Sequence, residues 1–384
     1  MNNHRFSLQS FRIFVFFMIL LLFTGIYSAS AQAPDCEAVT VTAGSLTIAI
    51  DPRIELLSII QFLTDYKGFN DMPVLTRFDF PYKQEIATLF EQYSQHPAAN
   101  SFQEMSRKGF WYSHPPKSML YLSNPPELKQ NLQFDELVIL TAGGRDNLTD
   151  FIEAVRSFSR ETHFIEFFNQ HRGMYKQLVT QYRKEMKRDY VKDLEDYYGS
   201  KQQSYTIILV PLFHQGGFGP RIQRGEGIFD AYYIGGPRQI LDNMPHFGND
   251  DNIRYLCWHE FSHSFVNHLT DRNIDGFRTS GMILLGLTSK EKVESLGGNF
   301  DVQISDWVSE HIVRGVTSRL AYINLGKEKG DEMVQFEIGQ GFPYVKEITE
   351  CLADYDGHRD KYPTLASFYP EIIADFERLA RQNQ

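Results

Sequence analysis

The segment His259-Glu260-Phe261-Ser262-His263 has the residue types and the spacing of a metal-dependent hydrolytic site. On an α-helix, residues four apart lie on one face, about 6 Å apart at their β-carbons, so His259 and His263 can reach one ion. Glu260 lies one position further round and can take a proton from a water molecule on the metal. The pattern predicts a zinc peptidase with His259 and His263 as metal ligands and Glu260 as general base.

The residues around this motif predict that it lies on a helix packed in the core. Leu256, Phe261 and Phe265 give the segment an apolar face. Residues 249–252 read Asn-Asp-Asp-Asn and offer several N-cap side chains, so we expect a helix from about Asp251 to Leu269. The alternative is an ordinary helix whose histidines only form hydrogen bonds.

Catalytic zinc usually has three protein ligands and one position for water, so another side chain must complete the set. A metzincin-type extension is absent, because Val266 and Leu269 stand where a glycine and a histidine would be needed. Residues 302–320 are compatible with a second helix, and Glu310 within it is the preferred ligand. Arg314, one turn later, is expected to orient the Glu310 carboxylate by a charge-assisted bond.

Other side chains remain candidates for these roles. His311, Asp306 and Asp275 are the alternatives to Glu310 as the third ligand. A group that stabilises the oxyanion of the transition state is also expected, and Tyr322, Tyr232 and His311 have suitable chemistry. Nothing in the sequence selects one of them.

The first 31 residues have the pattern of a secretory signal peptide. Arg5 and Arg12 precede the apolar run Ile13–Phe23, and Ala29-Ser30-Ala31 forms a small-residue cleavage site. The run has 11 residues, fewer than the ~18 expected of a membrane-spanning helix, so cleavage before Gln32 is preferred over an uncleaved anchor. The sequence therefore predicts a secreted or periplasmic protein without a stable membrane anchor.

Charge and cysteine content narrow the class of protein further. The chain has 38 basic and 48 acidic residues, and loss of Arg5 and Arg12 with the leader changes the formal net charge from −10 to −12. This acidic balance argues against nucleic acid as a partner. Of the three cysteines, Cys36 and Cys351 can pair in an oxidising compartment or stay free, and Cys257 is expected to be a small buried residue.

The rest of the chain shows helical patterns first and strand patterns later. Helices are predicted over residues 55–63, 82–104 and 149–196, and strands over residues 45–50, 205–211 and 227–234. Zincin peptidases hold an extended substrate by main-chain bonds to a strand that borders the metal site, and Phe229–Ile234 is assigned that role. The alternative for this segment is a hairpin that only supports the core.

Several segments together resemble a family of uncharacterised secreted bacterial proteins with zincin-like, gluzincin-type features. The resemblance rests on Ile50–Leu57, on Gln95–Ala98, on the glycine loop with Gly216, Gly217 and Gly219, and on His259–Asn267. It implies a zincin fold with His259 and His263 as ligands, Glu260 as base, and the helix around Glu310 as source of the last ligand. It implies no substrate.

These observations predict an α+β protein with a zincin-like metallopeptidase fold, in which a helical N-terminal lobe precedes a small mixed sheet and a C-terminal helical region. The expected boundaries are a signal peptide over residues 1–31, a helix-rich lobe over 32–200 and a catalytic lobe over 201–384. The expected cofactor is Zn²⁺, and the expected partner is a peptide or protein substrate. The alternative function is a catalytically silent surface protein that binds peptide or glycan and holds a structural zinc.

Overall fold

The computed structural model describes residues 36–66, 74–288 and 300–384. Residues 36–384 form one compact unit. The predicted signal peptide lies outside the described residues. Within the described ranges, every helix is too short or too polar to span a bilayer.

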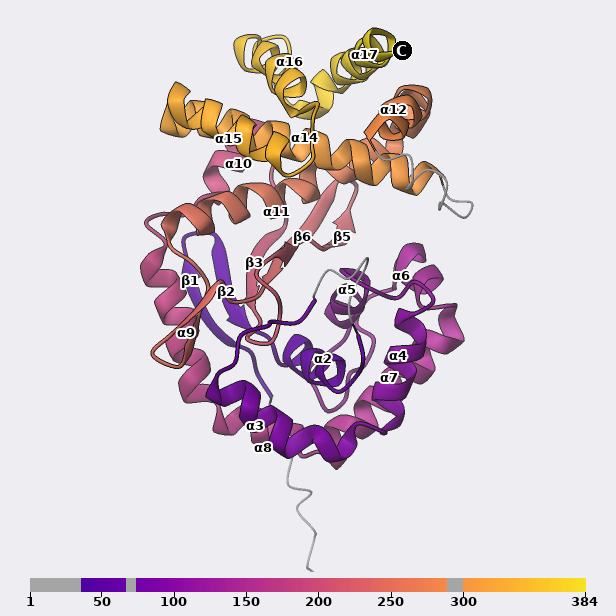
Figure 1. Cartoon of the computed structure of the whole chain (residues 1–384), viewed down its shortest axis with the longest axis vertical. Coiled ribbons are helices and arrows are strands. Elements are labelled where there is room, and N and C mark those ends of the chain that lie inside the picture. Colours follow the sequence, from indigo (N-terminus) through magenta and orange to yellow (C-terminus); the bar gives the residue numbers. More distant parts are fainter. Residues whose placement is uncertain (1–35, 67–73, 289–299) are drawn as a thin grey trace, which may run out of the picture. The chain divides into compact units, whose positions relative to one another are not determined.

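A mixed β-sheet lies at the centre of this unit (Figure 1). Its strands are β1 (Val39–Ala43), β2 (Leu46–Ile50), β3 (Ser204–Leu209), β4 (Gly217–Phe218), β5 (Arg221–Gly225) and β6 (Ile228–Gly235). The strand order is β1-β2-β3-β6-β4, and β5 also pairs with β6. Strands β2, β3 and β6 are parallel, whereas β1, β4 and β5 run antiparallel to their neighbours. A separate hairpin joins β7 (Gln239–Leu241) to β8 (Met244–His246).

The strand predicted before the helix of the His-Glu-x-x-His motif is present as β6. Its predicted role in holding an extended substrate is wrong. Strand β6 pairs with β3 along one edge and with β4 and β5 along the other. Because both rows of its main-chain groups are already used, Phe229–Ile234 cannot receive an extended peptide. Among the described strands, β1 pairs only with β2, and β4 and β5 pair only with β6, so β1 forms one edge of the sheet and β4 and β5 form the edge that contacts α11.

Helices of the first half of the chain lie beside this sheet (Figure 1). They are α2 (Pro52–Phe62), α3 (Pro81–Phe90), the short 3₁₀-helix η1 (Glu91–Tyr93), α4 (Pro97–Ser106), α5 (His114–Leu120), α6 (Glu136–Thr141), α7 (Arg145–Glu161), α8 (Phe164–Gln170), α9 (Arg172–Glu185) and α10 (Val191–Tyr198). Helix α9 packs on β1 and β2, and α2 packs on α4 and α5. The phenylalanines of α7 and α8 are buried, as their helical spacing predicts.

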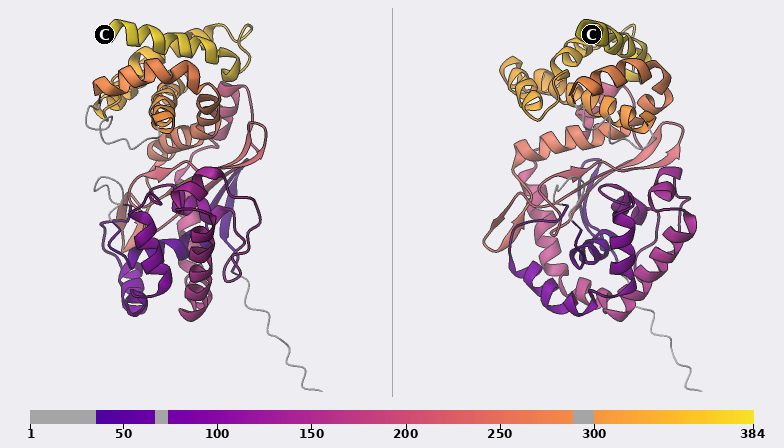
Figure 2. Two further views of the ribbon diagram at one scale, coloured as in Figure 1. Left: turned by 90° about the vertical axis from the view of Figure 1, so that its right-hand side faces the viewer. Right: turned by 45° about the vertical axis from the view of Figure 1, so that its right-hand side comes forward.

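Helix α11 (Asp250–Arg272) carries the His-Glu-x-x-His motif and agrees closely with the predicted helix. Its N-cap is Asn249, whose side chain accepts from the Asn252 amide while the Asn252 side chain accepts from the Asn249 amide. The residues of the motif are buried. Helix α11 lies between the sheet, which it contacts at β6, and helix α14 (Phe300–Leu325), and Figure 2 shows the same layering from two other directions.

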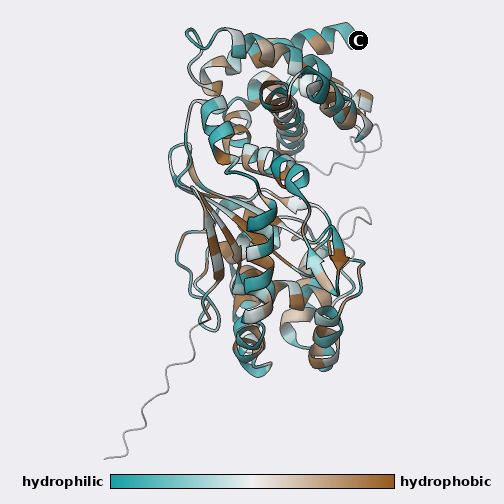
Figure 3. Cartoon of the chain, turned by 90° about the vertical axis from the view of Figure 1, so that its left-hand side faces the viewer, coloured by the Kyte–Doolittle hydropathy of each residue, from teal (hydrophilic) through white to brown (hydrophobic). Residues whose placement is uncertain are grey.

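The remaining helices follow in the C-terminal part of the chain. They are α12 (Ile274–Thr288), α15 (Lys327–Gly339), α16 (Val345–Gly357) and α17 (Leu365–Asn383). Helix α14 contacts α11, α12, α15 and α16. Figure 3 shows hydrophobic residues concentrated in the strands and mixed with hydrophilic residues along these helices. Such mixing is typical of helices with one face in a core and one in solvent.

This architecture confirms the predicted α+β class with a small mixed sheet. The predicted lobe boundary at residue 200 stays a prediction, although strands from both sides of it share one sheet. Among the described residues no disulfide joins Cys36 to Cys351, and Cys257 is buried inside α11.

Candidate metal centre

Helices α11 and α14 pack against each other through side chains from both helices. His259, His263 and Asp271 lie on α11, and Glu310 and Ser305 lie on α14. The imidazoles lie beside Glu310, while Ser305 donates to Asp271 at 2.6 Å. Residues later in α11 therefore meet residues earlier in α14, so the two helices run in opposite directions where they touch. The spacing of His259, His263 and Asp271 by multiples of four keeps these three on one side of α11.

These two helices carry the one group of His, Cys, Asp and Glu side chains in the described part of the chain that could hold a metal ion. One ligand atom from each of His259, His263 and Glu310 lies within 4.8 Å of the other two. The Nε2 atom of His263 is 3.3 Å from Oε1 of Glu310, and Nε2 of His259 is 3.8 Å from Oε2. Ligands of tetrahedral zinc lie about 3.3 Å apart, so two imidazole nitrogens within 3.8 Å of a carboxylate form a donor set that suits Zn²⁺.

Neighbouring residues hold both imidazoles in place. His259 stacks on Tyr255 with ring centroids 5.8 Å apart and an interplanar angle of 16°. Nδ1 of His263 lies 3.1 Å from Oδ1 of Asn267. A proton on Nδ1 makes this ring nitrogen the donor to Asn267 and leaves the Nε2 lone pair free toward Glu310. Nδ1 of His259 is buried without a hydrogen-bond partner in the described structure.

Glu260 is buried against the edge of the sheet and is not part of the three-residue cluster. A β-carbon on Gly217 would lie 3.2 Å from Oε1 of Glu260. A β-carbon on Gly219 would lie 2.5 Å from the Glu260 carbonyl oxygen and 3.1 Å from Oε2. The glycine-rich loop therefore lets the open edge of the sheet approach the carboxylate more closely than larger residues would allow.

A chain of polar contacts supports Glu310 from the side of α15. Nε of Arg314 donates to Oε2 of Glu310 at 3.2 Å, which agrees with the predicted orienting bond. Another nitrogen of Arg314 pairs with Glu337, whose side chain is 0% exposed. Tyr255 donates to the other oxygen of Glu337 at 3.0 Å. Because Arg314 is shared between two acids, Glu337 limits how strongly it can hold Glu310.

The surroundings of His259, Glu310 and Glu260 shift the pKa values of these three groups in different ways. Burial lowers the pKa of His259 to about 3, so this imidazole is neutral and has a lone pair for a metal. Burial acts to raise the pKa of Glu310, but His263, His259 and Arg314 outweigh it and lower the pKa to about 2. Burial, and then the charge of Glu310, raise the pKa of Glu260 to about 8. Glu260 is thus poised to exchange protons near neutral pH.

Tyr112 lies near this site and was not predicted from the sequence. It belongs to the loop between α4 and α5 and has a left-handed backbone with φ of 52°. Its ring meets that of Phe218 in β4 edge to face at 4.6 Å, and its amide donates to Tyr66 at 2.7 Å. Burial and then the charges of Glu260 and Glu310 raise the pKa of its phenol. A bulky residue in this strained conformation is the structural signal of a functional position.

The other candidates for the third ligand lie elsewhere. His311 is buried on α14 against Trp307, with ring centroids 3.9 Å apart, and its Nδ1 lies 2.9 Å from the Trp307 carbonyl oxygen. Asp275 on α12 pairs with Arg278 at 2.7 Å. Asp306 lies one turn before Glu310 and is exposed. The structure places none of the three in the cluster with His259 and His263.

The two tyrosines considered for the oxyanion also lie apart from the cluster. Tyr322 is 12 residues after Glu310 on α14, and its hydroxyl donates to Asp331 at 2.5 Å. Tyr232 on β6 interacts electrostatically with Arg53 and Asp230 rather than with Glu260.

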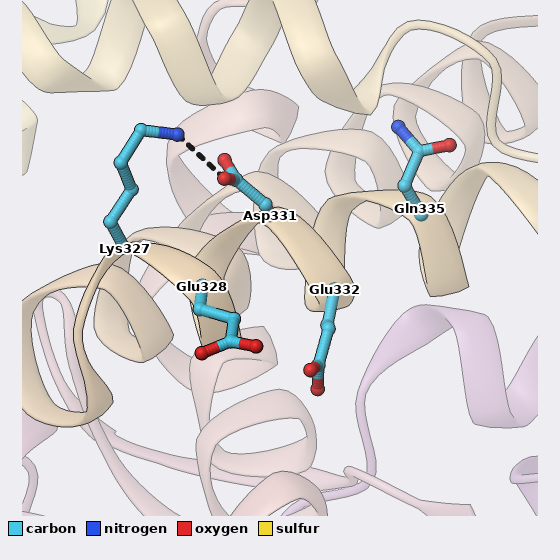
Figure 4. Close-up of a pocket in the computed structure, with 5 residues that line it drawn as sticks. All are labelled: Lys327, Glu328, Asp331, Glu332 and Gln335. Atoms are coloured by element: carbon cyan, nitrogen blue, oxygen red, sulfur yellow. Dashed lines mark hydrogen bonds and ion pairs between the residues drawn. The ribbon is translucent and has the colours of Figure 1, made fainter.

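A hollow on the surface of α15 is separate from this centre (Figure 4). It is lined by side chains of one helix only: Lys327, Glu328, Asp331, Glu332 and Gln335. Lys327 pairs with Asp331 across it at 2.6 Å. None of these residues belongs to the His-Glu-x-x-His motif or contacts it.

Comparison with known proteins gives one match. A family model described as a domain of unknown function, DUF4932, matches residues 46–375, which is most of the chain and includes both α11 and Glu310. No curated protein and no solved structure shows significant similarity to the chain.

Proposed function

The chain belongs to the DUF4932 family, and we propose that it is a zinc-dependent peptidase of the zincin, gluzincin-type class. The observation that carries the proposal is the convergence of His259, His263 and Glu310 beside the buried Glu260. Two imidazoles and one carboxylate form the ligand set of many catalytic zinc sites, which keep a further position for water or substrate. Glu310 is 32% exposed, so the carboxylate side of the cluster is open to solvent.

The protein groups then divide the work of hydrolysis. Zinc, when bound, polarises a peptide carbonyl and makes water more acidic. Glu260 takes a proton from the attacking water and passes it to the amine nitrogen as the C–N bond breaks, which yields a carboxylate and an amine. The phenol of Tyr112 donates a hydrogen bond to the oxyanion that develops on the carbonyl oxygen. Its raised pKa keeps this phenol protonated at neutral pH.

The open edge formed by β4 and β5 is the proposed binding surface for an extended substrate. Gly217 and Gly219 bring this edge against Glu260. A peptide that added to the edge by main-chain hydrogen bonds would lie across the metal site. We also propose that the leader over residues 1–31 directs the protein to the periplasm or the exterior, where peptide substrates are available.

The variant Glu260→Gln tests the assignment of the general base. We expect it to bind zinc with the stoichiometry of the unaltered protein and to lose peptide hydrolysis by about 10²- to 10⁴-fold. Glu328→Gln, which changes an exposed acid of the α15 hollow, is the matched control and should change neither quantity. Zinc is measured by elemental analysis and hydrolysis with a mixture of fluorogenic peptides. Full activity of Glu260→Gln would contradict the proposed base.

A further inference from the structure

Asp306 lies on the same side of α14 as Glu310 but lacks the contacts that its neighbours make. The two acids are four residues apart on one helix, so their side chains leave the same face. Glu310 is paired with Arg314, and Asp271 opposite is paired with Arg221 at 3.3 Å. Asp306 is exposed and has no hydrogen bond or ion pair with any residue that the structure describes.

The surroundings of Asp306 make its ionised form less stable than that of an ordinary aspartate. Desolvation by neighbouring atoms, and then the negative charges of Glu310 and Asp271, raise the pKa of Asp306 to about 7, while the charge of Arg221 acts to lower it. Arg221 is already shared with Asp271 and stacks over Phe229 at 5.3 Å. At neutral pH this carboxyl group is therefore only partly ionised, and a ligand with a positive charge would stabilise its ionised form.

The open edge of the sheet leads from Glu260 toward this carboxyl group. Gly217 and Gly219 contact Glu260, and two residues later Arg221 begins β5 and reaches Asp271 at the end of α11. Arg221 also interacts electrostatically with Asp306, so a peptide extended along this edge, at about 3.3 Å per residue, would run from Glu260 toward Asp306. The edge formed by β4 and β5 and the face of α14 with Asp306 therefore lie at the same end of the proposed peptide site.

We propose that Asp306 binds a positively charged group of the substrate, an ammonium or a guanidinium, close to the bond that is cleaved. The proposal rests on the proposed peptidase function and adds a substrate class to it. Two parts of a peptide supply this chemistry: a free N-terminal ammonium, and the side chain of lysine or arginine. The first source makes the protein an exopeptidase that removes N-terminal residues, and the second gives it a preference for basic sequences.

Peptide binding to Glu260→Gln protein loaded with zinc tests the proposal without turnover. Two short, C-terminally labelled peptides with uncharged side chains, one with a free N-terminus and one N-acetylated, are compared by fluorescence anisotropy with two series of the acetylated peptide. One series carries a single lysine at each position in turn, and the other carries glutamine at the same positions. We expect either the free N-terminus or one lysine position to tighten binding about five- to tenfold. Asp306→Asn should abolish that preference and leave binding of the neutral acetylated peptide unchanged. Glu328→Gln should keep the preference.

The outcomes separate this proposal from the peptidase proposal. Absence of any cation preference, absence of peptide binding, or equal weakening of all peptides by Asp306→Asn would overturn the role of Asp306. Loss of zinc affinity in Asp306→Asn would also overturn it, because the residue would then belong to the metal site. Cleavage is measured separately with Glu260 intact. Binding that depends on Asp306 without cleavage would contradict the peptidase proposal and leave the cation site standing.

Discussion

Glu55 and Glu310 show how neighbouring groups decide the protonation state of a glutamate inside this protein. On α2, Glu55 accepts from Tyr82 at 2.6 Å, and its other oxygen has no partner in the described structure. Burial raises its pKa to about 7. The pKa of Glu310 instead falls to about 2, since two imidazoles and Arg314 outweigh burial. Glu55 is a neutral core acid over the acidic pH range, whereas Glu310 is kept ionised and is partly exposed beside the two imidazoles.

Burial alone therefore does not make an acid functional. A carboxyl group without a nearby cation takes up a proton and becomes part of the core. A carboxylate held ionised among imidazole nitrogens is an acceptor for a cation. Substitutions at Tyr112, Glu55 and Glu337 test both parts of this contrast.

The largest effect is expected from Tyr112→Phe on the metal side. Phenylalanine keeps the ring contact with Phe218 but removes the hydroxyl that we propose to stabilise the oxyanion. We expect kcat to fall about 10²- to 10³-fold, with KM and zinc content nearly unchanged. Steady-state kinetics on one peptide measures this effect.

The matched control is Tyr322→Phe, which removes a hydroxyl that is bonded to Asp331 instead. It should leave kcat unchanged. If Tyr112→Phe raised KM and left kcat intact, the tyrosine would act in substrate binding and its assignment to the oxyanion would be wrong.

On the core side, Glu55→Gln should change how stability depends on pH. Since the pKa of Glu55 is raised from 4.5 to about 7 in the folded protein, the unfolded state loses this proton first as pH rises. The free energy of unfolding should therefore fall by about 3 kcal/mol between pH 4.5 and 7 and then stay level. Glutamine can still accept from Tyr82 and has no proton to lose, so the variant should not show this decline.

Urea unfolding at a series of pH values measures the difference between the two proteins. Asp150→Asn, which changes an exposed acid on α7, should reproduce the pH dependence of the unaltered protein. The same decline in Glu55→Gln would show that Glu55 is ionised in the folded state, and the contrast with Glu310 would disappear.

A smaller effect, on zinc affinity, is expected from Glu337→Gln. Glu337 is fully buried like Glu55 but pairs with Arg314, and so it weakens the bond between Arg314 and Glu310. Without its charge, Arg314 should hold Glu310 more tightly and compete with zinc. We expect zinc affinity to fall about 10- to 100-fold. Competition with a chelator measures it.

Glu332→Gln on the same helix is the control, because this acid is exposed and pairs only with Lys329. A purely structural role for Glu337 would instead lower the midpoint of thermal unfolding and leave zinc affinity unchanged.

The sequence predicts the motif helix well because the determinants are local. Asn249 caps α11, and the four-residue spacing of His259 and His263 fixes their common face. Glu310 and Arg314 could be selected because they also lie four apart on a predicted helix. Their meeting with α11 is a tertiary contact that the spacing within α14 cannot specify.

Features that depend on distant pairing could not be predicted. The interior position of β6 follows from its pairing with β3 and from the return of β4 and β5 along its other edge. Glu55 lies in a segment whose pattern predicts an amphipathic helix, yet residues 54–61 of α2 are all buried because other elements surround it. Tyr112 lies near the candidate site through a loop far from the motif in sequence, and its left-handed backbone becomes visible only in the structure.

The most direct test of the proposed metal site is a zinc-edge anomalous diffraction map of crystals grown with Zn²⁺, together with the zinc content of the same protein. We predict one zinc ion per chain, bonded to Nε2 of His259, Nε2 of His263 and the carboxylate of Glu310, with a remaining position for water. A zinc-free protein, a peak elsewhere, or a fourth protein ligand that closes the site would contradict the proposed catalytic function.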